Sequence, residues 1–157
     1  MYFFVSSQNL PMGYEAPPFP SLFWPAGAFT SRFQSAYLYY SSDMWTFTVW
    51  WSMIFFGSAY FMAGVWSGLT MFVQSYRQVR VGARKRTLGW RPFFIVPTYF
   101  VIGSIQGLLS GALVGLILML IYKAGSLAMS TWIPFCWGMA SILYHICSSY
   151  STSLSIM

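Results

Sequence analysis

The chain has 157 residues, of which 57% are hydrophobic and 22% aromatic, and it carries only eight Lys or Arg and two Asp or Glu residues. Because about a quarter of the residues in a soluble domain are charged, this composition excludes an ordinary soluble protein and indicates a membrane protein. The net charge of +6 does not indicate nucleic-acid binding, because most of the cations lie in one short segment between two apolar runs.

The hydrophobic pattern predicts an all-α membrane protein with three transmembrane helices and an irregular N-terminal segment. Residues 1–43 are aromatic and contain five prolines, Pro11, Pro17, Pro18, Pro20 and Pro25, which prevent a continuous helix. Two arrangements remain open: a segment at the membrane interface, where aromatic rings are favoured, or a loop packed on its own protein. A short helix around 30–40 is a further expectation.

Residues 44–150 form the predicted transmembrane domain, and its first span covers residues 44–73. We expect Asp43 to cap the N-terminus of this helix. No charged residue occurs between Asp43 and Arg77, so the apolar stretch exceeds the roughly 20 residues that cross the hydrocarbon core, and the helix should tilt or extend beyond it. Three glycines recur along this span: Gly57, Gly64 and Gly68.

A basic loop follows the first span. It contains six of the eight cations: Arg77, Arg80, Arg84, Lys85, Arg86 and Arg91. Such a cluster is typical of a cytoplasmic loop, and it gains about 1 kcal/mol per cation beside anionic lipid headgroups. We therefore expect the 77–91 loop to be cytosolic and to bind headgroups. Three crossings then place the N-terminus in the lumen and the C-terminus in the cytosol.

The second predicted span, residues 93–122, carries the most informative pattern. Four glycines recur at four-residue intervals and share one helix face: Gly103, Gly107, Gly111 and Gly115. In lipid, such a stripe allows close packing. If the glycines of the first span meet the stripe, it is internal; if the stripe faces outward, it receives a partner helix or an acyl chain. We expect Gln106 to hydrogen bond to a neighbouring helix, and Pro97 to leave 92–97 as an entry turn or kink.

The third predicted span covers residues 131–150 and follows a turn at 123–130. We expect Gly125 to end the second helix, and Ser130 or Thr131 to cap the third. Residues 151–157 form a short polar tail.

The sequence contains no motif for catalysis or metal binding. The side chains that could act in catalysis or bind a metal are scattered along the chain: Glu15, Asp43, His145, Cys136 and Cys147. The two cysteines would lie about 16 Å apart along one helix, too far to form a disulfide, and we expect His145 to be structural. A non-enzymatic protein without metal or other cofactor is therefore expected.

Three short runs, in this order, resemble the transmembrane protein 170 family over about residues 42–150. They are Asp43-Met44-Trp45, Tyr122-Lys123-Ala124 and Ile133-Pro134-Phe135. The chain departs from the family in its longer basic loop, its lengthened 123–130 turn and its N-terminal segment. The resemblance implies a three-span protein of the endoplasmic reticulum and nuclear envelope, associated with shaping reticulum sheets, and it makes partnership with a bridge-like lipid-transfer protein plausible. It carries over no catalytic residue.

The pattern and the resemblance together predict a membrane-organising or anchoring subunit of a larger membrane assembly, acting through glycine-lined helix packing. The alternative is a lipid-handling accessory subunit of a bridge-like lipid-transfer complex, with lipid in the glycine groove and headgroups on the basic loop. The expected partners are membrane lipids and other integral membrane proteins, and not nucleic acid.

Overall fold

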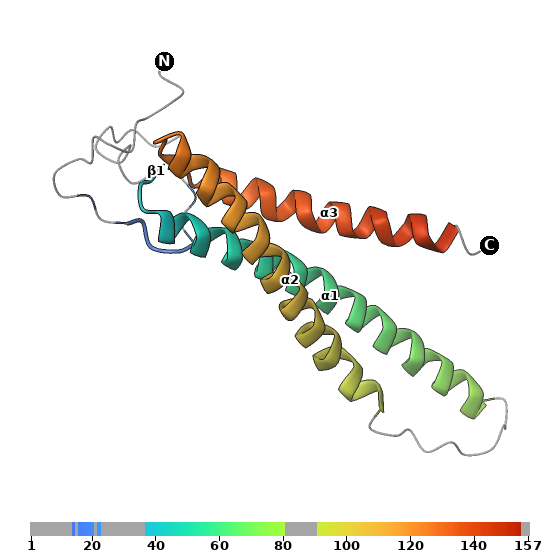
Figure 1. Cartoon of the computed structure of the whole chain (residues 1–157). Helices are drawn as coiled ribbons and strands as arrows, with labels where there is room; N and C mark the ends of the chain where they lie inside the picture. The colour runs from blue at the N-terminus through green and yellow to red at the C-terminus, as the bar shows by residue number, and fades with distance from the viewer. Residues whose placement is uncertain (1–13, 15, 21, 23–36, 81–90, 155–157) are drawn as a thin grey trace, which may run out of the picture. The chain divides into compact units, whose positions relative to one another are not determined.

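The computed structural model describes residues 14, 16–20, 22, 37–80 and 91–154 (Figure 1). Three helices and one pair of short strands occur in these residues: β1 (Tyr37–Leu38), α1 (Ser41–Arg80), α2 (Arg91–Ala124), β2 (Met129–Ser130) and α3 (Trp132–Leu154). Two of the helices, α1 and α2, are long and apolar enough to cross a membrane. The all-helical, apolar character predicted from the sequence is thus confirmed, and α3 as a third span stays a prediction.

The chain divides into two compact units. The first contains Met1–Ser52 and Leu108–Met157, and the second contains Met53–Gly107. Consequently α1 and α2 each contribute one part to each unit.

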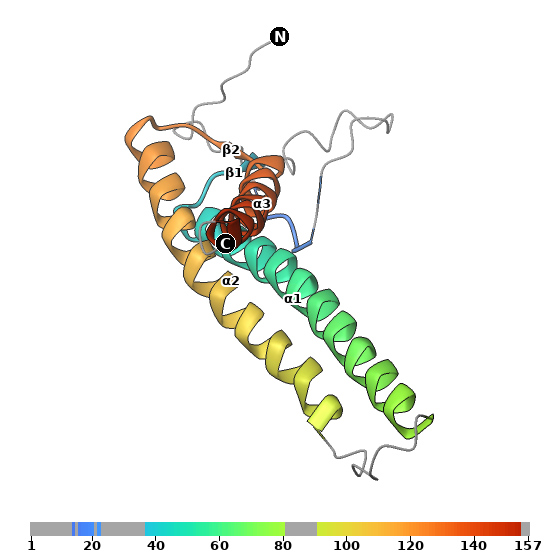
Figure 2. The same cartoon turned by 90° about the vertical axis from the view of Figure 1, so that its right-hand side faces the viewer.

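The core of the first unit lies where α1 and α3 begin and α2 ends. Strands β1 and β2 lie next to each other there (Figure 2). They pair antiparallel, with Leu38 opposite Met129. Leu38 and Met129 are fully buried, and they cluster with Met44 and Phe47 from the first two turns of α1. This small apolar core holds the first residues of α1 beside the turn that precedes α3.

The described part of the N-terminal segment packs on this core. The Tyr14 hydroxyl donates a 2.9 Å hydrogen bond to the Tyr37 carbonyl, and the Phe19 ring centroid lies 5.4 Å from that of Phe47. These described residues pack on their own protein, and a position of the segment at the membrane interface stays a prediction. The short helix expected around 30–40 is wrong at its end, because β1 occupies Tyr37–Leu38, and residues 30–36 lie outside the described residues.

Helix α1 begins at Ser41, before the position expected from the sequence. The Asp43 N–H donates to the Tyr40 carbonyl at 3.1 Å, as does the Met44 N–H at 3.2 Å. Asp43 therefore lies in the first turn and is not the capping residue. A carboxylate in this position still interacts favourably with the positive end of the helix dipole.

Helix α2 continues through Pro97, so the expected turn or kink at 92–97 does not interrupt it. A proline removes one backbone donor, a loss that membrane helices tolerate when neighbouring groups satisfy the remaining carbonyls. The adjacent Thr98 hydroxyl donates to the Phe94 carbonyl at 2.7 Å. The second turn of α2 therefore has an additional hydrogen bond beside the proline.

The end of α2 is a Schellman turn. The Leu127 N–H donates to the Tyr122 carbonyl at 3.1 Å, and the Ser126 N–H donates to the Lys123 carbonyl at 3.2 Å. The left-handed residue of this turn is Ser126, with φ 49°. Gly125, which the sequence indicated as the terminator, lies one residue earlier.

Candidate functional site

In the first unit, the glycine stripe of α2 packs directly on α1. A Cβ atom placed on Gly111 would lie 2.7 Å from the Ser52 Cβ and 3.0 Å from the Val49 Cα. A Cβ on Gly115 would lie 3.0 Å from the Trp45 Cδ1. Gly111 therefore requires glycine for steric reasons, whereas a Cβ on Gly115 would need the Trp45 side chain to shift by a few tenths of an ångström.

In the second unit, the same stripe meets another part of α1. A Cβ on Gly103 would lie 2.5 Å from the Tyr60 Cβ, and a Cβ on Gly64 would lie 3.0 Å from the Tyr99 Cβ. Gly57 differs from both, because its nearest neighbour, the Phe100 ring, would be 3.5 Å away. Glycine is therefore required at Gly103, a Cβ on Gly64 would be tight against Tyr99, and an alanine would fit at Gly57.

We call the four stripe residues of α2 the glycine seam: Gly103, Gly107, Gly111 and Gly115. All four are buried, whereas Gly68 on α1 is half-buried. At Gly103, Gly111 and Gly115 the neighbours are α1 side chains and backbone. At these three positions the glycine stripe therefore faces α1 of the same chain, which is the internal arrangement. Helix α1 occupies the space that an acyl chain would need there.

Polar side chains beside the seam are satisfied largely by backbone carbonyls. The Trp45 Nε1 donates to the Ala112 carbonyl at 3.2 Å, and the Thr48 hydroxyl donates to the Met44 carbonyl at 2.8 Å. Ser52 is fully buried, and its hydroxyl has no hydrogen-bond partner in the described part of the chain. Small side chains thus serve the close packing of α1 on α2.

Gln106 lies outside the glycine seam. Its side chain is exposed in the middle of α2, and the neighbouring Ile102 and Ile105 are 49% and 57% exposed. The amide therefore stands on an outer apolar surface of the second unit. The hydrogen bond to a neighbouring helix that the sequence predicts for Gln106 stays a prediction.

The basic loop lies largely outside the described residues. Arg84, Lys85 and Arg86 fall there, and the structure describes Arg80 and Arg91 only as backbone at helix ends. Arg77, in contrast, is exposed on α1. Headgroup binding by the loop as a whole stays a prediction.

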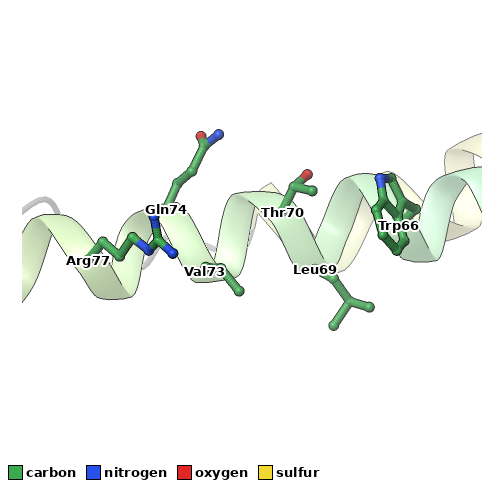
Figure 3. A pocket seen from close by; sticks show the side chains of 6 residues that line it. All are labelled: Trp66, Leu69, Thr70, Val73, Gln74 and Arg77. Atoms are coloured by element: carbon green, nitrogen blue, oxygen red, sulfur yellow. The ribbon is translucent and has the colours of Figure 1, made fainter.

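A shallow groove of about 330 Å³ runs along the last third of α1 (Figure 3). Its lining combines apolar and polar side chains, with Trp66 at one end and Arg77 at the other: Trp66, Leu69, Thr70, Val73, Gln74 and Arg77. Sequence reasoning identified only Arg77 among these. The available signal was the spacing of 66, 70, 73 and 77, which places them on one helix face.

Among the described residues, the other side chains that could act in catalysis or bind a metal do not form a cluster. Cys136 and Cys147 are free and exposed, and His145 is half-buried on α3. In the described ranges, no three His, Cys, Asp or Glu side chains come close enough to hold a metal ion.

Apolar helices, packed through glycine and exposed over much of their surface, define a membrane protein. The chain belongs to the transmembrane protein 170A/B-like family, whose model matches residues 37–157. This match confirms the resemblance found in the sequence. The chain is also 36% identical over 154 residues to Uncharacterized protein YPR153W of Saccharomyces cerevisiae, covering 98% of each chain. No solved structure matches the chain.

Proposed function

We propose that this protein is a non-enzymatic subunit that organises or anchors a larger assembly in the endoplasmic reticulum membrane. Its described helices act as a scaffold. At the glycine seam α1 and α2 pack closely on each other. The helix surfaces that face away from this contact are available to another integral membrane protein. The family resemblance supports the reticulum and nuclear envelope as its location. The cluster of cations in the 77–91 loop supports a topology with the N-terminus lumenal and this loop cytosolic.

The observation that carries the proposal is the exposed amide of Gln106 on an apolar helix surface. An amide that faces hydrocarbon without a hydrogen bond costs several kcal/mol. A polar group on a partner helix removes this cost and contributes about 0.6–2 kcal/mol to helix association. Gln106 therefore marks the surface on which a partner helix docks.

The alternative function is a lipid-handling accessory subunit, with a bridge-like lipid-transfer protein as its partner. The sequence predicted lipid in the glycine seam for this function, but α1 lies against Gly103, Gly111 and Gly115 there. It keeps the basic loop as its headgroup site. In the first function the protein acts by binding another protein chain, and in the alternative it acts by binding lipid.

The test compares Gln106→Leu with the unaltered protein, both purified from native membranes in mild detergent. We expect equal protein levels and insertion, and a loss of about threefold to thirtyfold in a specific copurifying membrane protein. The matched control is Ile105→Leu, an exposed neighbour without a polar group.

Recovery of the same partner in equal amounts with Gln106→Leu would contradict the proposal. A second measurement separates the alternatives, namely the lipid content of the two purified proteins. Loss of lipid without loss of any partner chain would favour the lipid-handling subunit.

A further inference from the structure

The groove on α1 combines an apolar wall with one cation. Trp66 is 73% exposed, Leu69 is 54% exposed and Val73 is 48% exposed. Figure 3 shows the Arg77 side chain lying back along the helix toward Gln74 and Val73. Apolar surface and a positive charge thus line the same groove.

Arg77 has no acidic partner within its own unit. The chain contains only two acidic residues, Glu15 and Asp43, and both belong to the first unit, whereas Arg77 belongs to the second. A guanidinium binds phosphate through two parallel charge-assisted hydrogen bonds. The charge in this groove is therefore complementary to an anion supplied from outside the unit.

The length and polarity of the groove match one lipid leaflet. Eleven residues separate Trp66 from Arg77, which corresponds to about 16 Å along a helix, and half of a hydrocarbon core is about 15 Å. Gln74, which carries an amide, lies one helical turn from the cation, at the depth of a lipid's ester groups. Val73, Leu69 and Trp66 follow, at the depth of an acyl chain.

We propose that this groove binds a single glycerophospholipid with an anionic headgroup. Arg77 holds the phosphate, Gln74 contacts the glycerol ester region, and one acyl chain lies against Val73, Leu69 and Trp66. The site is separate from the glycine seam, and it does not require the partner helix proposed at Gln106.

The test uses the full chain in phosphatidylcholine vesicles that contain a photoactivatable phosphatidylserine or, in parallel, a photoactivatable phosphatidylcholine. Peptide mapping by mass spectrometry then measures labelling of the α1 stretch 66–77. We expect phosphatidylserine to label this stretch about tenfold more than phosphatidylcholine, and Arg77→Gln to abolish the difference. Lys123→Gln, which removes an exposed cation at the far end of α2, should leave it unchanged.

A second variant tests the groove itself without a change of charge. Thr70→Trp fills the groove and should reduce labelling by both lipids, whereas Leu113→Trp, on an exposed surface of α2, should not. Equal labelling by the two lipids in the unaltered protein would overturn the proposal, because equal labelling is what unselective contact with the surrounding bilayer lipid produces. Cross-links from this stretch to another protein chain in native membranes, with no lipid label, would overturn it as well.

Discussion

The indole nitrogen of Trp45, near the start of α1, donates a 3.2 Å hydrogen bond to the backbone carbonyl of Ala112 on α2. The same indole fills the space beside Gly115, where an added Cβ would lie 3.0 Å from its Cδ1. A single side chain therefore contributes both a hydrogen bond and close packing to the first unit.

Replacing Trp45 with Phe should remove this hydrogen bond and keep most of the packing. We expect the free energy of unfolding to fall by about 0.5–1.5 kcal/mol, measured by titrating the protein in mixed micelles with dodecyl sulfate. Trp137→Phe is the control, because the Trp137 side chain is 49% exposed. An equal loss in both variants would show that the Ala112 contact contributes nothing specific.

Alanine at Gly111 should destabilise the first unit, because its Cβ would approach the Ser52 Cβ and the backbone of Val49, which cannot move aside cheaply. Overpacking of this kind costs about 1–3 kcal/mol. The matched control is Gly57→Ala, whose Cβ would be at ordinary contact distance from its neighbours. The same titration should show a clear loss for Gly111→Ala and none for Gly57→Ala, and the reverse order would refute an internal seam.

Glycine at Ser126 should stabilise the protein by up to about 1 kcal/mol, because a left-handed backbone conformation penalises residues that have a Cβ. Ser126 has φ 49°. As a control of opposite sign, Ser58→Gly in the interior of α1 should cost about 0.5 kcal/mol through lost helix propensity. Thermal inactivation in one detergent compares the three proteins, and a destabilised Ser126→Gly variant would contradict the prediction.

Alkaline pH should weaken the docking of the N-terminal segment. Burial raises the pKa of Tyr14 above its ordinary value of 10.0, although a backbone hydrogen bond from Tyr39 opposes this. Because the folded state favours the neutral phenol, its contribution to stability is complete below pH 10 and is lost as the pH rises through the folded pKa.

The measurement is the tyrosinate absorbance difference between the protein and its Tyr14→Phe variant during an alkaline titration. The difference should appear above the pH range of an exposed tyrosine. Ionisation of Tyr14 at or below that range would contradict its burial against β1.

Protease applied to intact microsomes should cut within the 84–86 cluster and leave an N-terminal tag protected. The physical reason is the retention of cationic loops in the cytosol, and the opposing Lys123 is a single charge. Detergent-opened microsomes provide the control, because the tag should then be digested. Digestion of the tag in intact microsomes, with survival of the loop, would invert the proposed topology.

The sequence alone determined the class of protein and the family. Apolar length and charge bias are properties of composition and order, so the long apolar spans and the basic loop could be recognised without a fold. The glycine spacing likewise predicted a packing face, because residues four apart share a helix face whatever lies opposite.

Tertiary structure decided what lies opposite that face and where each helix ends. Contacts such as Gly111 with Ser52, or Gly103 with Tyr60, join positions far apart in the chain, so periodicity within one helix cannot reveal them. The pairing of Leu38 with Met129 has the same cause, and it takes the place of the end of the helix expected at 30–40. Ser126 took the left-handed position beside Gly125 because the hydrogen bonds of the turn, and not residue preference alone, select which residue adopts it.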